Sequence, residues 1–352
     1  MSLSDVTLIV HSYNRPDLLF RLLRYYSRCP ELADVEIIVA DGSREAERRE
    51  FLRRMSAAGI SLDYRMMPFP PELPLHHRIE AVLAVVTRPL LLLAADDDFY
   101  LFDWLVEAID YLARHPDTGI AYGQYLTFSL GGFRAFSDRI LFAAPVSERP
   151  PIPWQEQPSG AERLSEIARL DGGLTTLGWY ALQRTDLFKR MVAMASGYDL
   201  PMLLFEKFLV VAQAAATKAH MIDRLFIARQ SDVDPDRDPP SAPFGLRENR
   251  AAVERLKACC AEWLTVECEI VDAQGLIDEV LAAELRSMRD ADRKRFARAL
   301  AGRWPMLNRL RRRNPVSADP DRLAVRDHRL MQPRPVRDFK PYTAMIAREV
   351  LP

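Results

Sequence analysis

The first 130 residues alternate between short strand-like runs and longer amphipathic runs, and this alternation restricts the fold more than any other feature. Runs typical of buried parallel strands stand at 6–10, 35–40, 61–66, 90–95 and 119–128. The runs between them place apolar residues three or four positions apart, as on one face of a helix. Strands that alternate with helices imply right-handed crossovers. We therefore expect an α/β fold with a mostly parallel central sheet flanked by helices.

The alternation continues more loosely to about residue 230 and then stops. Between two proline-rich stretches, 143–160 and 231–246, the spacing predicts further elements: helices near 160–170, from 186 and over 200–217, and strands near 174–182 and 220–228. These changes predict four segments: one α/β domain over 1–230 with halves 1–130 and 131–230, an Asp/Pro-rich loop at 231–246, a helical, basic appendage over 247–313 and an irregular tail over 314–352.

Composition and motifs exclude several classes of protein. The chain has 352 residues, of which 49% are hydrophobic and 28% charged, so a wholly disordered chain is excluded. No two glycines stand as G-x-G, and no G-K-[ST] occurs, so the dinucleotide-binding and P-loop motifs are absent. The four cysteines form no C-x-x-C pair, and no apolar run approaches about 20 residues. We therefore expect a reduced, cytoplasmic protein that does not span a membrane.

Polar clusters follow three of the predicted strands, at 11–16, 41–43 and 96–98. Ligands of parallel α/β sheets bind beyond the carboxyl ends of the strands. Three polar strand ends in one sheet therefore predict a binding site along this edge.

The third cluster is the acidic triplet Asp96, Asp97 and Asp98. Adjacent carboxylates repel one another, and a hard divalent cation such as Mg²⁺ or Mn²⁺ offsets that repulsion while sharing its other ligands with phosphates and water. In an extended strand Asp96 and Asp98 would point to one side and Asp97 to the other. The structural alternative is a solvated turn or a helix N-cap. Capping requires one carboxylate rather than three, so we favour the metal or nucleotide-sugar interpretation.

These clusters, in this order, resemble family 2-type glycosyltransferases of the GT-A fold. The resemblance rests on four segments: Ser12-Tyr13-Asn14-Arg15-Pro16 after the first strand, Asp41-Gly42-Ser43 after the second, LLLAADDDF at 91–99, and HPDTGIAYG at 115–123. It covers the first 130 residues well and extends loosely to about residue 230.

The resemblance implies metal-dependent, inverting transfer of a sugar from a nucleotide-diphosphate sugar, a UDP-sugar foremost, to a hydroxyl acceptor in bacterial surface glycan or glycoconjugate synthesis. It assigns the nucleotide-sugar site to these residues: Ser12, Tyr13, Asn14, Arg15, Asp41, Arg78, Asp96 and Asp97. It assigns the Mn²⁺ or Mg²⁺ ligands to Asp98 and Asp96. The structural alternatives are a helix start at Arg15, an ordinary turn at Asp41, a core position for Tyr13 and a surface position for Arg78.

Inverting transfer requires a carboxylate that takes the proton of the acceptor hydroxyl. The resemblance implies that this base lies near the start of a helix on the acceptor side. Glu206 interrupts the apolar run MLLFEKFLVV and is our preferred base, with Asp199 as the rival. Asp199 could instead cap the helix, and Glu206 could pair with a basic neighbour. Trp179 and Tyr180 could stack against an acceptor sugar, although core packing explains at least one of them as well.

The segment 286–313 carries 11 basic and two acidic residues, a net charge of +9, interspersed with apolar residues that include Trp304. Such a segment can lie on an anionic membrane surface, which would suit a lipid-linked acceptor and peripheral attachment at the inner face of the membrane. A solvated helix packed on the catalytic domain explains it equally well. No nucleic-acid-reading motif accompanies the charge, so we expect no nucleic-acid partner. No feature of the sequence indicates the oligomeric state.

Two other functions remain open at this stage. A sugar-phosphate nucleotidyltransferase has a similar layout, but it needs a glycine-rich loop after the first strand, and residues 11–16 contain no glycine. A catalytically degenerate nucleotide-sugar-binding or scaffold protein would not need the intact acidic triplet. The glycosyltransferase interpretation is therefore preferred.

Overall fold

The computed structural model describes residues 1–129, 141–143, 158–169, 177–230, 250–282 and 345. Its strands are β1 (Val6–Ser12), β2 (Glu36–Asp41), β3 (Arg65–Pro68), β4 (Leu90–Ala95), β5 (Asp98–Tyr100), β6 (Thr118–Ser129), β7 (Leu141–Ala143), β8 (Leu182–Arg184) and β9 (Lys218–Gln230). Its α-helices are α1 (Pro16–Tyr26), α2 (Glu45–Ala57), α3 (Leu75–Leu83), α4 (Leu105–Arg114), α5 (Gly160–Arg169), α6 (Leu177–Tyr180), α7 (Thr185–Gly197), α8 (Met202–Ala216) and α9 (Arg250–Val266), with a further helical segment over 273–282.

The described strands form one sheet in the order β3-β2-β1-β4-β8-β6-β9-β5, and β7 pairs with β6. The four strands β3, β2, β1 and β4 are parallel, as the alternation of strands and helices predicts. Beyond them β8 runs antiparallel to both β4 and β6, and β5 runs antiparallel to β9. The sheet is therefore parallel from β3 to β4 and mixed beyond β4.

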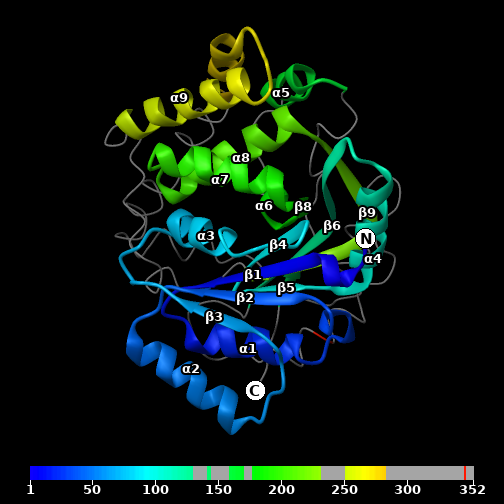
Figure 1. Ribbon diagram of the computed structural model, residues 1–352, viewed down its shortest axis with the longest axis vertical. Helices are drawn as coiled ribbons and strands as arrows, with labels where there is room; N and C mark the ends of the chain where they lie inside the picture. Colours follow the sequence, from blue (N-terminus) through cyan, green and yellow to red (C-terminus); the bar gives the residue numbers. More distant parts are fainter. Residues whose placement is uncertain (130–140, 144–157, 170–176, 231–249, 283–344, 346–352) are drawn as a thin grey trace, which may run out of the picture.

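Helices cover both faces of the sheet (Figure 1). Helices α1 and α2 lie on one face, and α3, α7 and α8 lie on the other, with α9 forming a further layer against α8. The apolar residues of β1, β2 and β4 are buried, because strands covered on both faces have no exposed side. Among the described residues, no helix is long and apolar enough to cross a lipid bilayer.

The helical appendage is part of the same hydrophobic core. Trp263 of α9 is buried, its ring packs edge-on against Phe208 of α8 at 6.0 Å, and its Nε1 donates to the carbonyl of Ala212 at 3.2 Å. A buried indole that finds a hydrogen-bond partner anchors its helix firmly. The predicted loop at 231–246, the basic segment 286–313 and the tail 314–352 except residue 345 lie outside the described residues.

One predicted element is wrong. The apolar run near 174–182 does not form the expected strand: Leu177–Tyr180 is the short helix α6, and only Leu182–Arg184 extends as β8. The single helical turn packs against α8, where Gln213 Nε2 donates to the carbonyl of Gly178 at 3.0 Å. Periodicity alone cannot distinguish a short buried strand from a short buried helix, so this contact decides the local structure.

Candidate functional site

The first predicted polar cluster meets the acidic triplet at the adjacent ends of β1 and β4. In the parallel register His11 pairs with Ala95, which brings the next residues of the two strands together. Ser12 Oγ donates to Asp96 Oδ2 at 2.7 Å, and Arg15 Nη1 donates to Asp96 Oδ1 at 3.2 Å. All three side chains are buried. The structure thus joins two clusters that are some 80 positions apart in the sequence.

The acidic triplet is not an extended strand, which corrects the expected alternation of its side chains. Asp96 and Asp97 form the turn between β4 and β5, and Asp98 is the first residue of β5. Arg15 Nη1 contacts Asp97 Oδ2 at 3.4 Å as well as Asp96. Asp98 instead lies opposite Arg229 in the β5–β9 register, and its Oδ2 is 3.5 Å from Arg229 Nε. The turn therefore directs neighbouring carboxylates to two different guanidinium groups.

Burial keeps two carboxylates of the triplet from ionising readily. Burial and the charge of Asp97 together raise the pKa of Asp96 to about 7, against the opposing effect of Arg15. Burial and Asp97 also raise the pKa of Asp98 to about 7, against Arg229. Arg15 and Arg229 contact the triplet, and the charges of Arg21 and Arg78 act on Asp97 and Asp96 as well. These cations do not offset the cost of burial at Asp96 and Asp98, which favours binding of a proton or a further cation there.

Arg229, which follows the strand predicted near 220–228, is a central residue of the site. Its Nη2 donates to the hydroxyl of Tyr180 at 2.9 Å, and its Cζ lies 4.4 Å from the centre of the Tyr180 ring. Burial alone would lower the pKa of Arg229, but Tyr180 and the neighbouring carboxylates raise it overall. Arg229 therefore remains a cation. The only local signal was an arginine at the end of a predicted strand, which is common in many proteins.

The two predicted acceptor-binding aromatics are enclosed by protein. Trp179 is 3% exposed and packs edge-on against His11 and Phe205, and Tyr180 is 7% exposed and holds Arg229. Their contacts support a role in positioning the site. Stacking of an acceptor sugar on either ring stays a prediction.

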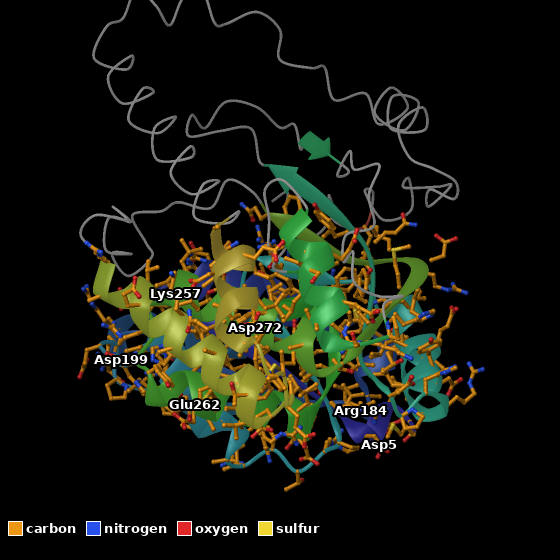
Figure 2. The ribbon with its side chains drawn as sticks, turned by 90° about the horizontal axis from the view of Figure 1, so that it is seen from above. Asp5, Arg184, Asp199, Lys257, Glu262 and Asp272 are labelled. Atoms are coloured by element: carbon orange, nitrogen blue, oxygen red, sulfur yellow. The ribbon has the colours of Figure 1, made fainter. Side chains whose placement is uncertain are left out.

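The two candidate bases lie in different places. Glu206 of α8 is half-buried, and burial raises its pKa while Lys207 and Arg229 act against that rise. Its charge also acts on Tyr180 and on Arg229, whose Nε lies 3.5 Å from Asp98 Oδ2. Asp199 lies between α7 and α8 with a side chain that is 78% exposed, at the edge of the molecule (Figure 2). Its neighbours are His76 and His77 rather than the triplet.

The second polar cluster is tied to the first by side-chain hydrogen bonds. Asn14, whose φ of 53° lies in the left-handed region, donates its backbone N–H to Ser43 Oγ at 2.8 Å. Asp41 is buried and accepts from the Ser43 backbone N–H at 3.0 Å and from Arg48 Nε at 2.6 Å. These bonds use about half of the lone pairs of a carboxylate. Ser43 belongs to the predicted cluster, whereas Arg48 is a supporting residue that the sequence pattern did not reveal.

Arg78 is buried rather than on the surface, which rules out the structural alternative for it. Its Nη1 donates to the carbonyl of Ser12 at 3.0 Å, and its Cζ lies 5.7 Å from the ring centre of Tyr13. Its Nε is buried without a hydrogen-bond partner among the described residues. A buried cation with an unused donor beside two strand ends is suited to an anionic ligand.

Gly42 is the residue that makes room for Arg78, and its replacement by alanine tests the role of this cation. A Cβ at Gly42 would lie 2.6 Å from Arg78 Cζ, so the guanidinium must move away from the Ser12 carbonyl. We expect Gly42→Ala to weaken binding of a nucleotide-diphosphate sugar about tenfold or more, as loss of one charge-assisted contact implies. Isothermal titration calorimetry measures this change.

Gly197→Ala is the matched control for this substitution, because a Cβ there meets no atom within 4 Å. The melting temperature of Gly42→Ala should change little, since only the end of a flexible side chain has to move. Equal donor affinity in Gly42→Ala and Gly197→Ala would show that Arg78 does not contribute to binding.

The comparisons with known proteins agree with this geometry at the level of the fold. No protein-family model matches the sequence. No curated protein matches it either. Among solved structures, residues 1–349 of S. aureus TarS in complex with UDP-GlcNAc match with a TM-score of 0.52 and 13% identity, over 80% of this chain and 72% of that one.

Two further solved structures are similar more loosely. TarS 1–349 without that ligand has a TM-score of 0.49 at 13% identity, over 80% of this chain and 71% of that one. The Pyrobaculum calidifontis mannosyltransferase PcManGT, in complex with GDP-Man and Mn²⁺, has a TM-score of 0.44 at 16% identity, over 98% of this chain and 86% of that one. TM-scores below 0.5 are too low to support an argument. The match to the UDP-GlcNAc complex confirms the predicted architecture: the chain has the GT-A-like α/β fold that TarS also has.

Proposed function

We propose that the protein is a glycosyltransferase that moves a sugar from a nucleotide-diphosphate sugar to a hydroxyl acceptor. The observation that carries this proposal is the buried acidic turn of Asp96 to Asp98, held between Arg15 and Arg229 at the carboxyl ends of a parallel sheet. The GT-A-like fold and the UDP-GlcNAc bound to TarS support it. We further propose a UDP-sugar as the donor.

The donor set of the acidic turn fits a hard divalent cation. The ligands of the cation would be carboxylate oxygens. Burial and mutual repulsion raise the pKa of these carboxyl groups, and bound Mg²⁺ or Mn²⁺ would offset the free-energy cost of keeping them ionised. No three acidic, His or Cys side chains converge there among the described residues, so the protein would supply one or two ligands. Asp98 and Asp96 are the proposed ligands. A cation bound there would stabilise the charge that develops on the departing diphosphate.

The other residues of the two strand ends have roles that follow from their positions. Ser12 and Arg15 orient Asp96, and Arg15 also contacts Asp97. Tyr13 and Asn14 are proposed to face the nucleoside, with Asp41 accepting a hydrogen bond from the base through its remaining lone pairs. Arg78 is proposed to donate from its unused Nε to the anionic part of the donor.

Glu206 is proposed as the general base of an inverting transfer. The acceptor hydroxyl gives its proton to the carboxylate while its oxygen attacks the anomeric carbon, and the nucleoside diphosphate leaves from the opposite face. Arg229 lies 3.5 Å from Asp98 and also interacts electrostatically with Glu206. It thereby connects the proposed base to the acidic turn. Asp199 remains the rival base, although its exposed position beside two histidines supports this role less well.

The pH profile of kcat/KM tests the state of Glu206. Because burial raises its pKa, the carboxylate becomes fully available only at a higher pH than for an ordinary glutamate. We expect kcat/KM to rise with pH on the acidic side of the profile. The midpoint of that rise should lie at a higher pH than the pKa of an ordinary glutamate. That rise should disappear in Glu206→Gln. A wild-type profile without such a rise would contradict this assignment.

A donor screen tests the proposed function as a whole. UDP-, GDP-, dTDP- and CDP-sugars are added with Mn²⁺, and the melting temperature is measured with and without each one. We expect one donor, a UDP-sugar, to raise the melting temperature in a metal-dependent manner. If no nucleotide sugar stabilises the protein, or if Asp96→Ala/Asp98→Ala responds equally, the proposal fails. Stabilisation by a nucleoside triphosphate and a sugar phosphate would instead favour a nucleotidyltransferase.

The acceptor is proposed to be a carbohydrate or a lipid-linked glycan. The basic segment 286–313, which would attach the protein to an anionic membrane surface, lies outside the described residues. Flotation of the full chain with vesicles that contain anionic lipid, compared with neutral vesicles, tests that attachment.

A further inference from the structure

A second group of metal-binding side chains lies away from the acidic turn, where α3 meets the connection between α7 and α8. One ligand atom each from His76, His77 and Asp199 lies within 4.8 Å of the other two. The Nε2 atoms of His76 and His77 are 3.7 Å and 3.9 Å from the same oxygen, Oδ1 of Asp199. Two imidazoles and one carboxylate thus converge on a single point.

His76 has an unsatisfied polar atom that faces this point. Its side chain is only 4% exposed, and its Nε2 is buried without a hydrogen-bond partner. Buried polar atoms without partners are uncommon, and each one requires an explanation. The ring packs against Phe205 of α8 at 5.7 Å and against His77 at 4.2 Å, so its orientation is set by the core. A ligand at this point would satisfy the atom.

The side chain of His77 and the backbone of Asp199 are held in positions that suit the same ligand. His77 Nδ1 lies 3.5 Å from Glu80 Oε2, which leaves Nε2 directed to Asp199. A carboxylate on the far nitrogen of a histidine is the usual support of a histidine that binds a metal. Asp199 has a φ of 45°, in the left-handed region, and Arg255 Nη2 donates to its carbonyl at 3.3 Å.

We propose that His76, His77 and Asp199 bind a zinc ion. Two histidine nitrogens and one carboxylate oxygen are a known ligand set for Zn²⁺, with a water molecule in the fourth position. Ligand atoms around a tetrahedral zinc ion are about 3.4 Å apart, as metal–ligand distances of about 2.0–2.2 Å require. The nitrogen–oxygen separations here exceed this value by a few tenths of an ångström, and Asp199, with its exposed side chain, is free to close the gap.

The position of this site gives the ion a structural role beyond the proposed transfer reaction. His76 and His77 directly precede Arg78 on α3. Asp199 lies just before α8, the helix that carries Glu206. A zinc ion would join the helix that carries the buried cation to the helix that carries the proposed base. It differs in ligand chemistry from the acidic turn, whose carboxylates favour Mg²⁺ or Mn²⁺.

Titration of the full chain, purified without a histidine tag, with ZnCl₂ in the absence of nucleotide tests this proposal. We expect one equivalent of Zn²⁺ to bind and the melting temperature to rise. Co²⁺ in place of Zn²⁺ should give the visible absorption of a tetrahedral site. His77→Gln and Asp199→Asn change partly or fully exposed side chains and avoid the core, and each should weaken Zn²⁺ binding by at least tenfold. Glu80→Gln should weaken it by about 10- to 100-fold.

Two controls make the result specific to this site. Asp110→Asn changes an exposed aspartate of α4 and should leave Zn²⁺ binding intact. Asp97→Asn changes the acidic turn and should also leave it intact, so failure of the donor site and failure of the zinc site are distinguishable. The proposal is overturned if Zn²⁺ does not bind, if His77→Gln and Asp199→Asn bind it as tightly as the wild type, or if Asp97→Asn abolishes binding.

Discussion

Replacing Glu206 by glutamine is expected to lower kcat by about 10²- to 10⁴-fold, the usual contribution of a general base. Glutamine keeps the size of the side chain but cannot accept the acceptor proton at neutral pH. Because Glu206 is half-buried at the start of α8, the substitution should not unfold the helix. Donor affinity should stay nearly unchanged, because the base contacts the acceptor. Initial rates at saturating donor, together with donor affinity from calorimetry, separate the two effects.

Two further variants show whether the fall in kcat results from the loss of the Glu206 carboxylate. Glu254→Gln changes an exposed glutamate of α9 and should retain full activity. Asp199→Asn tests the rival base directly. If Asp199→Asn loses turnover to the same extent and Glu206→Gln keeps it, the assignment of the base is wrong. If neither variant loses turnover, an inverting mechanism with either residue as base is wrong.

Replacing Asp98 by asparagine is expected to remove the metal dependence of donor binding and to lower kcat/KM by about 10³-fold, or about 4 kcal/mol. Asparagine has nearly the same shape but no charge, so it is a poor ligand for Mn²⁺ or Mg²⁺. The substitution also leaves Arg229 without its closest carboxylate, 3.5 Å away across the β5–β9 pair. Metal-titrated kinetics and Mn²⁺ binding by calorimetry measure the loss.

A loss of folding could imitate this result, so stability is measured in parallel. Asp97→Asn is the companion variant, because the Asp97 side chain is 15% exposed and its loss leaves both arginines with a partner. Asp110→Asn is the control for an aspartate outside the site. A folded Asp98→Asn protein that retains metal-dependent donor binding would show that Asp98 is not a ligand, and Asp96 would then be the residue to examine.

Much of the fold was predictable because its signals are local. Parallel strands buried on both faces require continuous apolar runs, and the runs 6–10, 35–40 and 90–95, which became β1, β2 and β4, are apolar except for Thr7 and Glu36. Proline at the first helical position marked the start of α1. The wrong prediction near 174–182 arose where a short apolar run could satisfy either a strand or a helix, and packing against α8 selected the helix.

The candidate site was predictable only in part, because only some of its contacts follow from local sequence signals. The common edge was predictable because the clusters 11–16 and 96–98 stand at the ends of strands in a parallel sheet. The roles of Ser12, Arg15 and Asp96 came from the family resemblance. Arg229 could not be assigned, because its contact with Asp98 depends on the antiparallel pairing of β5 and β9. Nor does the sequence reveal that Gly42 leaves space for Arg78.

The sequence by itself determined the α/β layering and the polar chemistry at the strand ends, because side-chain periodicity and strand direction are properties of neighbouring residues. The tertiary structure alone decided which carboxylate faces which cation. It placed Glu206 where its charge acts on Arg229, the partner of Asp98, and it placed Asp199 beside His76 and His77, although the two acids are only seven positions apart. Charges interact over a few ångströms of space, and that distance is set by packing rather than by separation along the chain.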